Sequence, residues 1–156
     1  MLAIINDEQL RAALQAEYLH LQKVIEDFDG RALTIKAWSI TFSLVALVGA
    51  FASHASAVFL VSSISALLFW FIEGSWKKFQ YVYYERSGDI EEYFRNEKKI
   101  DAPFQIGTSW SRCWQSGGAA RLKKILLWPH VALPHVIVAI LGLLLFLLTT
   151  TGVIKP

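Results

Sequence analysis

A run without any Asp, Glu, Lys or Arg occupies residues 37–72, and it restricts the fold more than any other feature. As a single helix the run would be about 54 Å long, at about 1.5 Å per residue. The hydrocarbon core of a bilayer is only about 30 Å thick, so one straight helix would overshoot it. The small, polar segment 53–56 lies at the middle of the run. We therefore expect a transmembrane hairpin of two helices, over about residues 34–53 and about residues 57–74.

A second uncharged run, residues 131–154, is long enough to cross a bilayer with some tilt. Pro129 and Pro134 fall in its first turns, where a missing amide hydrogen matters least, so they mark the start of a helix. With 54% hydrophobic and 18% charged residues, the chain is too apolar for an ordinary soluble domain. The sequence predicts an all-α integral membrane protein with about three transmembrane helices and cytoplasmic amphipathic helices.

The distribution of lysine and arginine predicts the orientation. Ten basic residues lie between the second and third transmembrane segments, none lies in the turn at 53–56, and only Lys155 follows the third segment. By the positive-inside rule, the N-terminus faces the cytoplasm and the C-terminus lies outside. Indole rings concentrate at membrane boundaries, and four tryptophans fall near the predicted cytoplasmic one: Trp38, Trp70, Trp76 and Trp128. We expect a multi-pass protein of a bacterial inner membrane, without a cleavable signal peptide.

Four regions follow from these boundaries. Residues 1–33 form a cytoplasmic amphipathic helix that leads into the membrane, and residues 34–74 form the transmembrane hairpin. Residues 75–130 form a cytoplasmic helix, a loop and a basic interfacial segment, and residues 131–156 form the third transmembrane helix with a short tail.

Apolar side chains recur at helical spacing on both sides of the hairpin, over residues 9–30 and 76–99. The two amphipathic helices can meet, and their apolar residues form a candidate assembly seam: Leu14, Tyr18, Leu21, Ile25, Phe28, Trp76, Phe79 and Tyr83. Packing on a neighbouring helix of the same chain is the simpler explanation of the same pattern. Gly30 allows a bend in the first helix. Continuity of the second through Gly88 is left open, because one internal glycine costs only about 1 kcal/mol.

Between these helices and the third transmembrane segment, residues 101–118 are polar and rich in glycine, which predicts a loop that lies back on the headgroups or the helices. A short basic amphipathic helix should follow over residues 119–128. Its candidate contacts to anionic lipid headgroups are Arg121, Lys123 and Lys124. The alternative is that these are ordinary flanking charges of a membrane segment.

Lys36 precedes the first transmembrane helix and Glu73 ends the second, so antiparallel packing would bring them to the same membrane edge. We interpret them as a candidate structural ion pair. Within the hairpin the polar side chains are otherwise mainly hydroxyls: Ser39, Thr41, Ser43, Ser62, Ser63 and Ser65. Because no ionisable group is expected near the middle of the membrane, ion-coupled transport is disfavoured. Small residues four apart also indicate close helix approach.

The sequence lacks phosphate-binding, dinucleotide-binding, serine-hydrolase and zinc-protease motifs. The lone Cys113 excludes an intrachain disulfide and a cysteine-built metal site. His130 and His135 are five residues apart, which does not give the shared face of a helical metal pair, so we expect both to pack at the interface. Acidic residues interleave with the basic ones, which weakens a field for nucleic acid. We expect no enzyme activity, no cofactor or metal, and no nucleic-acid partner.

Three segments carry a resemblance to a known group: residues 20–25 (HLQKVI), residues 36–42 (KAWSITF) and residues 69–73 (FWFIE). This arrangement over residues 18–95 resembles a group of small bacterial membrane proteins. Some proteins of that general build accompany anti-phage defence systems of the RADAR type or linked to CRISPR. The resemblance implies a membrane accessory or effector protein that forms oligomers and acts with a cytosolic protein.

Two functions of different kinds compete. The first is a homo-oligomeric membrane effector in anti-phage defence, which assembles through residues 9–30 and 76–99 and perturbs the membrane or opens a pore. The second is a passive anchor or scaffold that recruits a cytosolic complex. A pore needs a polar stripe that faces water, whereas a monomer would bury its hydroxyl rows in its own bundle. A small transporter or a lipid-modifying enzyme lacks the buried charges or catalytic groups it would need.

Overall fold

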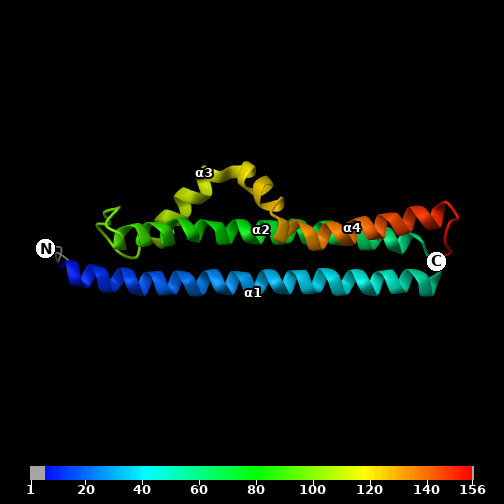
Figure 1. Cartoon of the computed structure of the whole chain (residues 1–156), viewed down its shortest axis with the longest axis horizontal. Coiled ribbons are helices and arrows are strands. Elements are labelled where there is room, and N and C mark those ends of the chain that lie inside the picture. The colour runs from blue at the N-terminus through cyan, green and yellow to red at the C-terminus, as the bar shows by residue number, and fades with distance from the viewer. Residues whose placement is uncertain (1–5, 156) are drawn as a thin grey trace.

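The computed structural model describes residues 6–155, which form four helices and no strand. The helices are α1 (Asp7–Ser53), α2 (Ala57–Phe94), α3 (Ile106–Leu126) and α4 (Pro129–Thr150). In Figure 1, α1 and α2 lie antiparallel along an elongated molecule, and the N- and C-terminal ends lie at opposite ends of it. Helices α1, α2 and α4 are long and apolar enough to cross a membrane. The protein is therefore all-helical with three candidate membrane spans.

Helix α1 begins at a capping box and runs for 47 residues without a break at Gly30. The Asn6 side chain accepts a hydrogen bond from the Gln9 amide at 2.8 Å, and the Gln9 side chain accepts one from the Asn6 amide at 3.3 Å. The helix ends where His54 adopts a left-handed conformation with φ of 51°. Residues 54–56 then turn the chain into α2, so the hairpin turns within the segment that the sequence indicated.

Helix α2 continues through Gly88 and ends at Phe94, which answers the question that the sequence left open. The C-terminal half of α2 and the N-terminal half of α1 together form the outer half of the hairpin, and the halves next to the turn form its inner half. In the outer half, the two helices pack through a cluster of fully buried aliphatic residues, Leu14, Leu21 and Ile90. Aromatic contacts extend this interface toward the candidate membrane spans, because the centroid of the Phe28 ring lies 5.1 Å from that of the Trp76 ring and 5.7 Å from that of the Tyr83 ring. The apolar stripes of the two helices thus meet each other.

The prediction of a loop over residues 101–118 is wrong from Ile106 onward, because α3 begins there. A Cβ atom at Gly107 or Gly118 would meet nothing within 4 Å, so α3 packs through other small residues: Ser109 and Cys113 are buried. Stacking of Trp110 on Trp114, and of Trp114 on Phe79 of α2, adds to the contact. The chain does break at Gly118, whose φ of 46° and ψ of −148° put a kink between the two parts of α3.

Helix α4 begins with Pro129 in its first turn and continues through Pro134. It approaches α2 closely at Gly142, where a Cβ atom would lie 2.5 Å from Ser63 Oγ and 2.8 Å from the Phe59 carbonyl oxygen. Only a glycine fits this contact without displacing backbone. An apolar cluster of Leu47, Ala50 and Phe59 closes the bundle near the hairpin turn. The inner halves of α1 and α2 and the whole of α4 therefore form one packed unit.

Candidate functional site

A buried cluster of ionisable side chains joins the three candidate membrane helices. Glu73 of α2 is fully buried and lies between a lysine of α1 and a histidine of α4. Lys36 Nζ is 2.6 Å from Glu73 Oε1, and His135 Nε2 is 2.9 Å from Glu73 Oε2. The Lys36 contact lacks hydrogen-bond geometry at Oε1, so it acts as an ion pair. One carboxylate thus holds two basic groups from two other helices.

The cluster continues from His135 to a hydroxyl on α1. His135 Nδ1 lies 2.9 Å from Ser39 Oγ, so the imidazole has a polar partner at each nitrogen. A neutral ring that donates from Nε2 to the carboxylate accepts the Ser39 hydroxyl at Nδ1, and a protonated ring donates at both positions. Both protonation states are therefore satisfied by the same heavy-atom positions. The cluster therefore joins α1, α2 and α4 through buried polar contacts.

The local sequence explains why these side chains converge. Lys36 and Ser39 are three residues apart on α1, so they share a helix face. The structure brings the predicted pair Lys36 and Glu73 together, but sequence reasoning assigned His135 to the interface with His130. A signal for His135 was present, because it is the one titratable residue between 131 and 154. An ionisable side chain in a transmembrane segment normally faces a polar partner inside the bundle.

Four serine side chains face the interior of the bundle, and one of them, Ser39, belongs to this cluster. Ser39, Ser43, Ser62 and Ser63 are buried, and Ser63 Oγ donates to the Ala139 carbonyl of α4 at 2.9 Å. Ser43 Oγ has no hydrogen-bond partner among the described residues. Thr41 is exposed and Ser65 is half-buried. The hydroxyls of residues 149–151 bond back to carbonyls of their own helix. The hydroxyl rows are thus largely enclosed by one chain.

A second buried ion pair lies in the outer half of the α1–α2 hairpin. Arg86 donates from Nε and Nη2 to the two carboxylate oxygens of Glu17, at 2.7 and 3.0 Å. Glu17 Oε2 also accepts a bond from the Phe104 amide at 2.7 Å, and Arg86 reaches the Ala102 carbonyl at 3.4 Å. This two-bond pair therefore ties the connection between α2 and α3 onto both helices. The sequence did hold a signal for Glu17, which lies three residues after Leu14 and four before Leu21 and so shares their buried face.

A third polar contact lies between these two, where Lys77 of α2 binds Asp29 of α1. Lys77 also donates to the Gln80 side chain at 2.8 Å, and Gln80 donates to the Ile25 carbonyl at 2.8 Å. Burial acts to raise the pKa of Asp29, but hydrogen bonds from Lys77 and Gln80 and the charges of Lys77 and Lys36 outweigh it, so the pKa is lowered. The Asp29 carboxylate is thus stabilised in its charged form.

The eight residues of the candidate assembly seam mostly pack against other residues of the same chain. Leu14, Leu21 and Ile25 are buried between α1 and α2, and the Tyr18 hydroxyl donates to Glu91 at 2.9 Å. Only Phe79 leaves much of its ring exposed among the seam residues of α2. Phe28, Trp76 and Tyr83 pack against one another. A contact between two copies of this conformation would have to use other surfaces.

The three candidate headgroup contacts separate into two kinds. Lys123 and Lys124 are exposed in the last turn of α3. Arg121 turns inward, donates to the Cys113 carbonyl at 2.5 Å and lies 4.8 Å from the centre of the Tyr81 ring. Only the two lysines therefore point freely outward, whereas Arg121 also braces the kinked helix.

Within residues 6–155, no group of three or more His, Cys, Asp or Glu side chains could hold a metal ion. No family model, curated protein or solved structure matches the chain. A functional assignment therefore rests on the arrangement of the chain's own residues.

Proposed function

We propose that the protein is a membrane-anchored scaffold that holds a cytosolic protein at the inner face of a bacterial membrane. One observation carries the proposal: the buried hydroxyls and the Glu73 cluster face the interior of a single chain. The outer surface of the candidate spans is mostly apolar, with side chains such as Val45, Val48 and Ile137 more than half exposed. A pore would instead need a polar stripe that faces water. Enclosed polar groups support an anchor over a pore.

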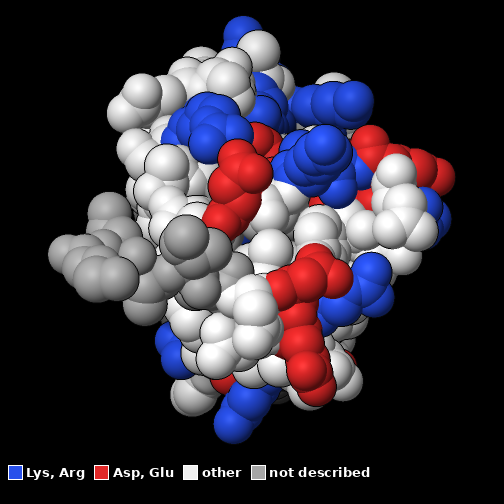
Figure 2. All heavy atoms as spheres, turned by 90° about the vertical axis from the view of Figure 1, so that its left-hand side faces the viewer, with Lys and Arg blue, Asp and Glu red and all other residues white. Residues whose placement is uncertain are grey.

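The outer half of the α1–α2 hairpin provides the rigid part of such a scaffold. Helix α1 has 47 residues, and at about 1.5 Å per residue it is about 70 Å long. A bilayer core takes up about 30 Å of that length, so a stalk of about 40 Å extends beyond it. The Glu17–Arg86 pair and the Leu14–Ile90 contacts hold this stalk together. Viewed from its tip, the stalk carries interspersed acidic and basic side chains (Figure 2).

Phe104 is the residue of the stalk that best fits contact with a partner. Its side chain is 67% exposed, although its backbone adopts a left-handed conformation with φ of 60°. Non-glycine residues rarely hold this conformation, and strained backbone is concentrated at functional sites. The Glu17 carboxylate holds the Phe104 amide and keeps the ring presented to solvent. A photo-crosslinking residue at position 104 should give a discrete adduct in cells, and one at Glu8 should not.

The scaffold proposal places the stalk and the N-terminus in the cytoplasm and the 53–56 turn outside. The test uses Cys113→Ser as background, with a single thiol at Ser53→Cys or Glu97→Cys. An impermeant thiol reagent applied to intact spheroplasts should label the first variant and not the second. Labelling of Ser53→Cys only from the cytoplasmic side would reverse the orientation.

The decisive measurement is ion conductance of the purified protein in planar bilayers. A scaffold gives no unitary currents. Stepwise currents that Ser43→Leu abolishes and that the lipid-facing control Val45→Ala preserves would establish the pore instead.

A homo-oligomeric effector is the second candidate, and Thr41 favours it. This hydroxyl is exposed on the outer face of α1, beside a hollow of about 200 Å³ that it lines with Ala37 and Trp38. A second copy could cover this face, because small and hydroxyl residues are common at helix contacts in membranes. The resemblance to accessory proteins of anti-phage defence also implies oligomers. The mass of the protein in a mild detergent or nanodisc distinguishes the two functions. A monomer supports the scaffold, and a discrete oligomer that dissociates in the Thr41→Phe variant supports the effector.

A further inference from the structure

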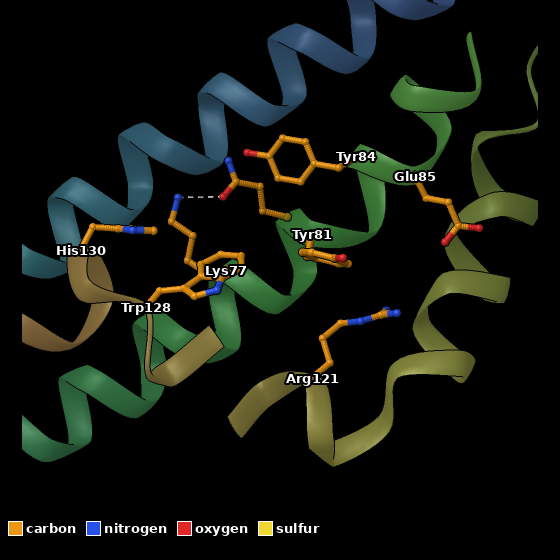
Figure 3. Close-up of a pocket in the computed structure, with 8 residues that line it drawn as sticks. Lys77, Tyr81, Tyr84, Glu85, Arg121, Trp128 and His130 are labelled. Carbon is orange, nitrogen blue, oxygen red and sulfur yellow. Dashed lines mark hydrogen bonds between the residues drawn. The ribbon is translucent and has the colours of Figure 1, made fainter. Parts of the chain in front are cut away.

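A pocket of about 490 Å³ opens where α2 leaves the candidate membrane region and α4 begins (Figure 3). Its walls come from three helices and include Lys77, Tyr81 and Tyr84 of α2, Arg121 of α3, and Trp128 and His130 at the start of α4. Lys77 lies one helical turn beyond Glu73, so the pocket sits directly outside the buried cluster. This is the level at which lipid headgroups meet a membrane protein.

The pocket presents one cation and one anion that lack ion-pair partners among the described residues. Arg121 makes no salt bridge there, and its guanidinium lies over the Tyr81 ring. Glu85 is half-buried, also without a salt bridge, and its carboxylate projects to the same side of the pocket as Arg121 (Figure 3). The charge of Lys77 is already balanced by Asp29. The pocket is therefore suited to a ligand that carries both signs of charge.

Aromatic rings fill the space around these two charges. Tyr81 and Tyr84 are 36% and 44% exposed, and the Tyr81 and Trp128 ring centroids are 6.3 Å apart. Such ring faces attract an ammonium group, which a nearby carboxylate can also hold. A neighbouring hollow of about 310 Å³ is also lined by Arg121, and it has the exposed Lys124 as a second basic residue. Leu127 beside it is 74% exposed, as expected for a residue next to acyl chains.

We propose that this pocket binds the headgroup of an aminophospholipid of the phosphatidylethanolamine class. Arg121 holds the phosphate, and Glu85 with the Tyr81 and Tyr84 rings holds the primary ammonium group. An anionic lipid without an amine brings no ammonium group to Glu85, and a choline headgroup has no N–H group to donate to it. The site goes beyond the scaffold function and depends only on the position of the pocket.

The test is a lipid titration by native mass spectrometry of the full chain in detergent. The probes are dioctanoyl phosphatidylethanolamine, phosphatidylglycerol and phosphatidylcholine. Wild type should bind the ethanolamine lipid about tenfold more tightly than the other two, as expected for one charge-assisted hydrogen bond. Glu85→Gln should remove this preference, and Arg121→Gln should weaken binding of all three. Arg112→Gln, which changes an exposed arginine of the same helix that lines neither hollow, should behave like wild type.

Binding of phosphatidylglycerol at least as tight as that of the ethanolamine lipid would overturn the proposal. An unchanged lipid preference in Glu85→Gln would also overturn it. If circular dichroism shows that Arg121→Gln does not fold, the Glu85→Gln variant alone tests the proposal. Either result leaves the scaffold function untouched, because conductance and topology are measured separately. Conversely, a conducting protein that prefers phosphatidylethanolamine would refute the scaffold and keep the lipid site.

Discussion

The two halves of the α1–α2 hairpin are held together by different residues, although the same two helices run through both. The outer half has large aliphatic residues at its interface, such as Leu14, Leu21 and Ile90. The inner half has small residues at its interface, such as Ser39, Ser62 and Ala66. In water, burial of apolar area contributes roughly 25 cal/mol per Å². In lipid that gain is missing, so helices associate through close backbone approach and hydrogen bonds.

Each half also buries an ion pair, and the two pairs differ in their surroundings. Glu17 and Arg86 form a closed pair in which both carboxylate oxygens accept hydrogen bonds. Glu73 instead contacts two side chains from two other helices, Lys36 of α1 and His135 of α4. The outer pair is suited to fixing a shape. The inner cluster is suited to joining three helices at one buried point.

The largest effect should come from Glu73→Ala. The substitution leaves Lys36 and His135 buried or half-buried without their shared carboxylate, which costs about 3–5 kcal/mol for a broken buried pair. The free energy of unfolding in mixed detergent micelles measures the loss. Glu97→Ala, at an exposed position, serves as the control and should stay within about 0.5 kcal/mol of wild type. A loss of under about 1 kcal/mol for Glu73→Ala would make the inner cluster unimportant for stability.

A double-mutant cycle separates the ion pair from the other roles of Glu73. Lys36→Ala and Glu73→Ala should together destabilise less than the sum of the single effects, with a coupling of about 0.5–3 kcal/mol. Additive losses would mean that the two charges do not interact.

Leu21→Ala should give the next largest effect, and it tests the outer half. Leu21 is fully buried in the aliphatic cluster, so removal of its side chain should cost about 2–5 kcal/mol. Leu19 is two residues away and 62% exposed, which makes Leu19→Ala a matched control with little expected change. Chemical denaturation followed by circular dichroism gives both values. Equal losses at the two positions would show that the stalk interface is not where α1 and α2 meet.

Gly142→Ala tests whether close backbone approach holds the inner half together. The added Cβ would meet Ser63 Oγ at 2.5 Å and the Phe59 carbonyl oxygen at 2.8 Å, and overpacking of this kind costs about 1–3 kcal/mol. Leu143→Ala changes a neighbouring side chain that is 47% exposed and should have a smaller effect. Both variants are compared by thermal unfolding in the same detergent. If Gly142→Ala is as stable as wild type, close backbone approach between α2 and α4 does not stabilise the inner half.

The smallest effect concerns pH and Asp29. Its folded pKa is lowered from 3.8, so its contribution to stability is complete above that pH and disappears as the pH falls below it. Because the side chain is half exposed, the contribution should be at most about 1 kcal/mol. The stability difference between wild type and Asp29→Asn should therefore be present at about pH 6 and vanish at about pH 2. A difference that grows on acidification would contradict the assigned sign.

The sequence could predict the hairpin, its turn and the helical class, because the absence of charge between residues 37 and 72 and the thickness of a bilayer leave few alternatives. It could not predict α3, because the glycines of residues 101–118 favour a loop locally, whereas the helix is held by contacts such as the stacking of Trp114 on Phe79 of α2. The Lys36–Glu73 proximity follows from hairpin geometry alone. The partners Ser39 and His135 depend on how α4 packs, which no local pattern determines.

Helices α1 and α2 run from the candidate membrane region into the stalk without interruption, since neither Gly30 nor Gly88 breaks them. In the proposed scaffold, the hairpin would therefore move as one rigid rod that pivots at the bilayer surface. Transmembrane helices adjust to bilayer thickness by tilting, on average by about 20°. A stalk of about 40 Å converts a tilt of that size into a sideways movement of about 14 Å at its tip. In the proposed scaffold, a protein bound near Phe104 would thus move along the membrane surface when the tilt of the helices changes.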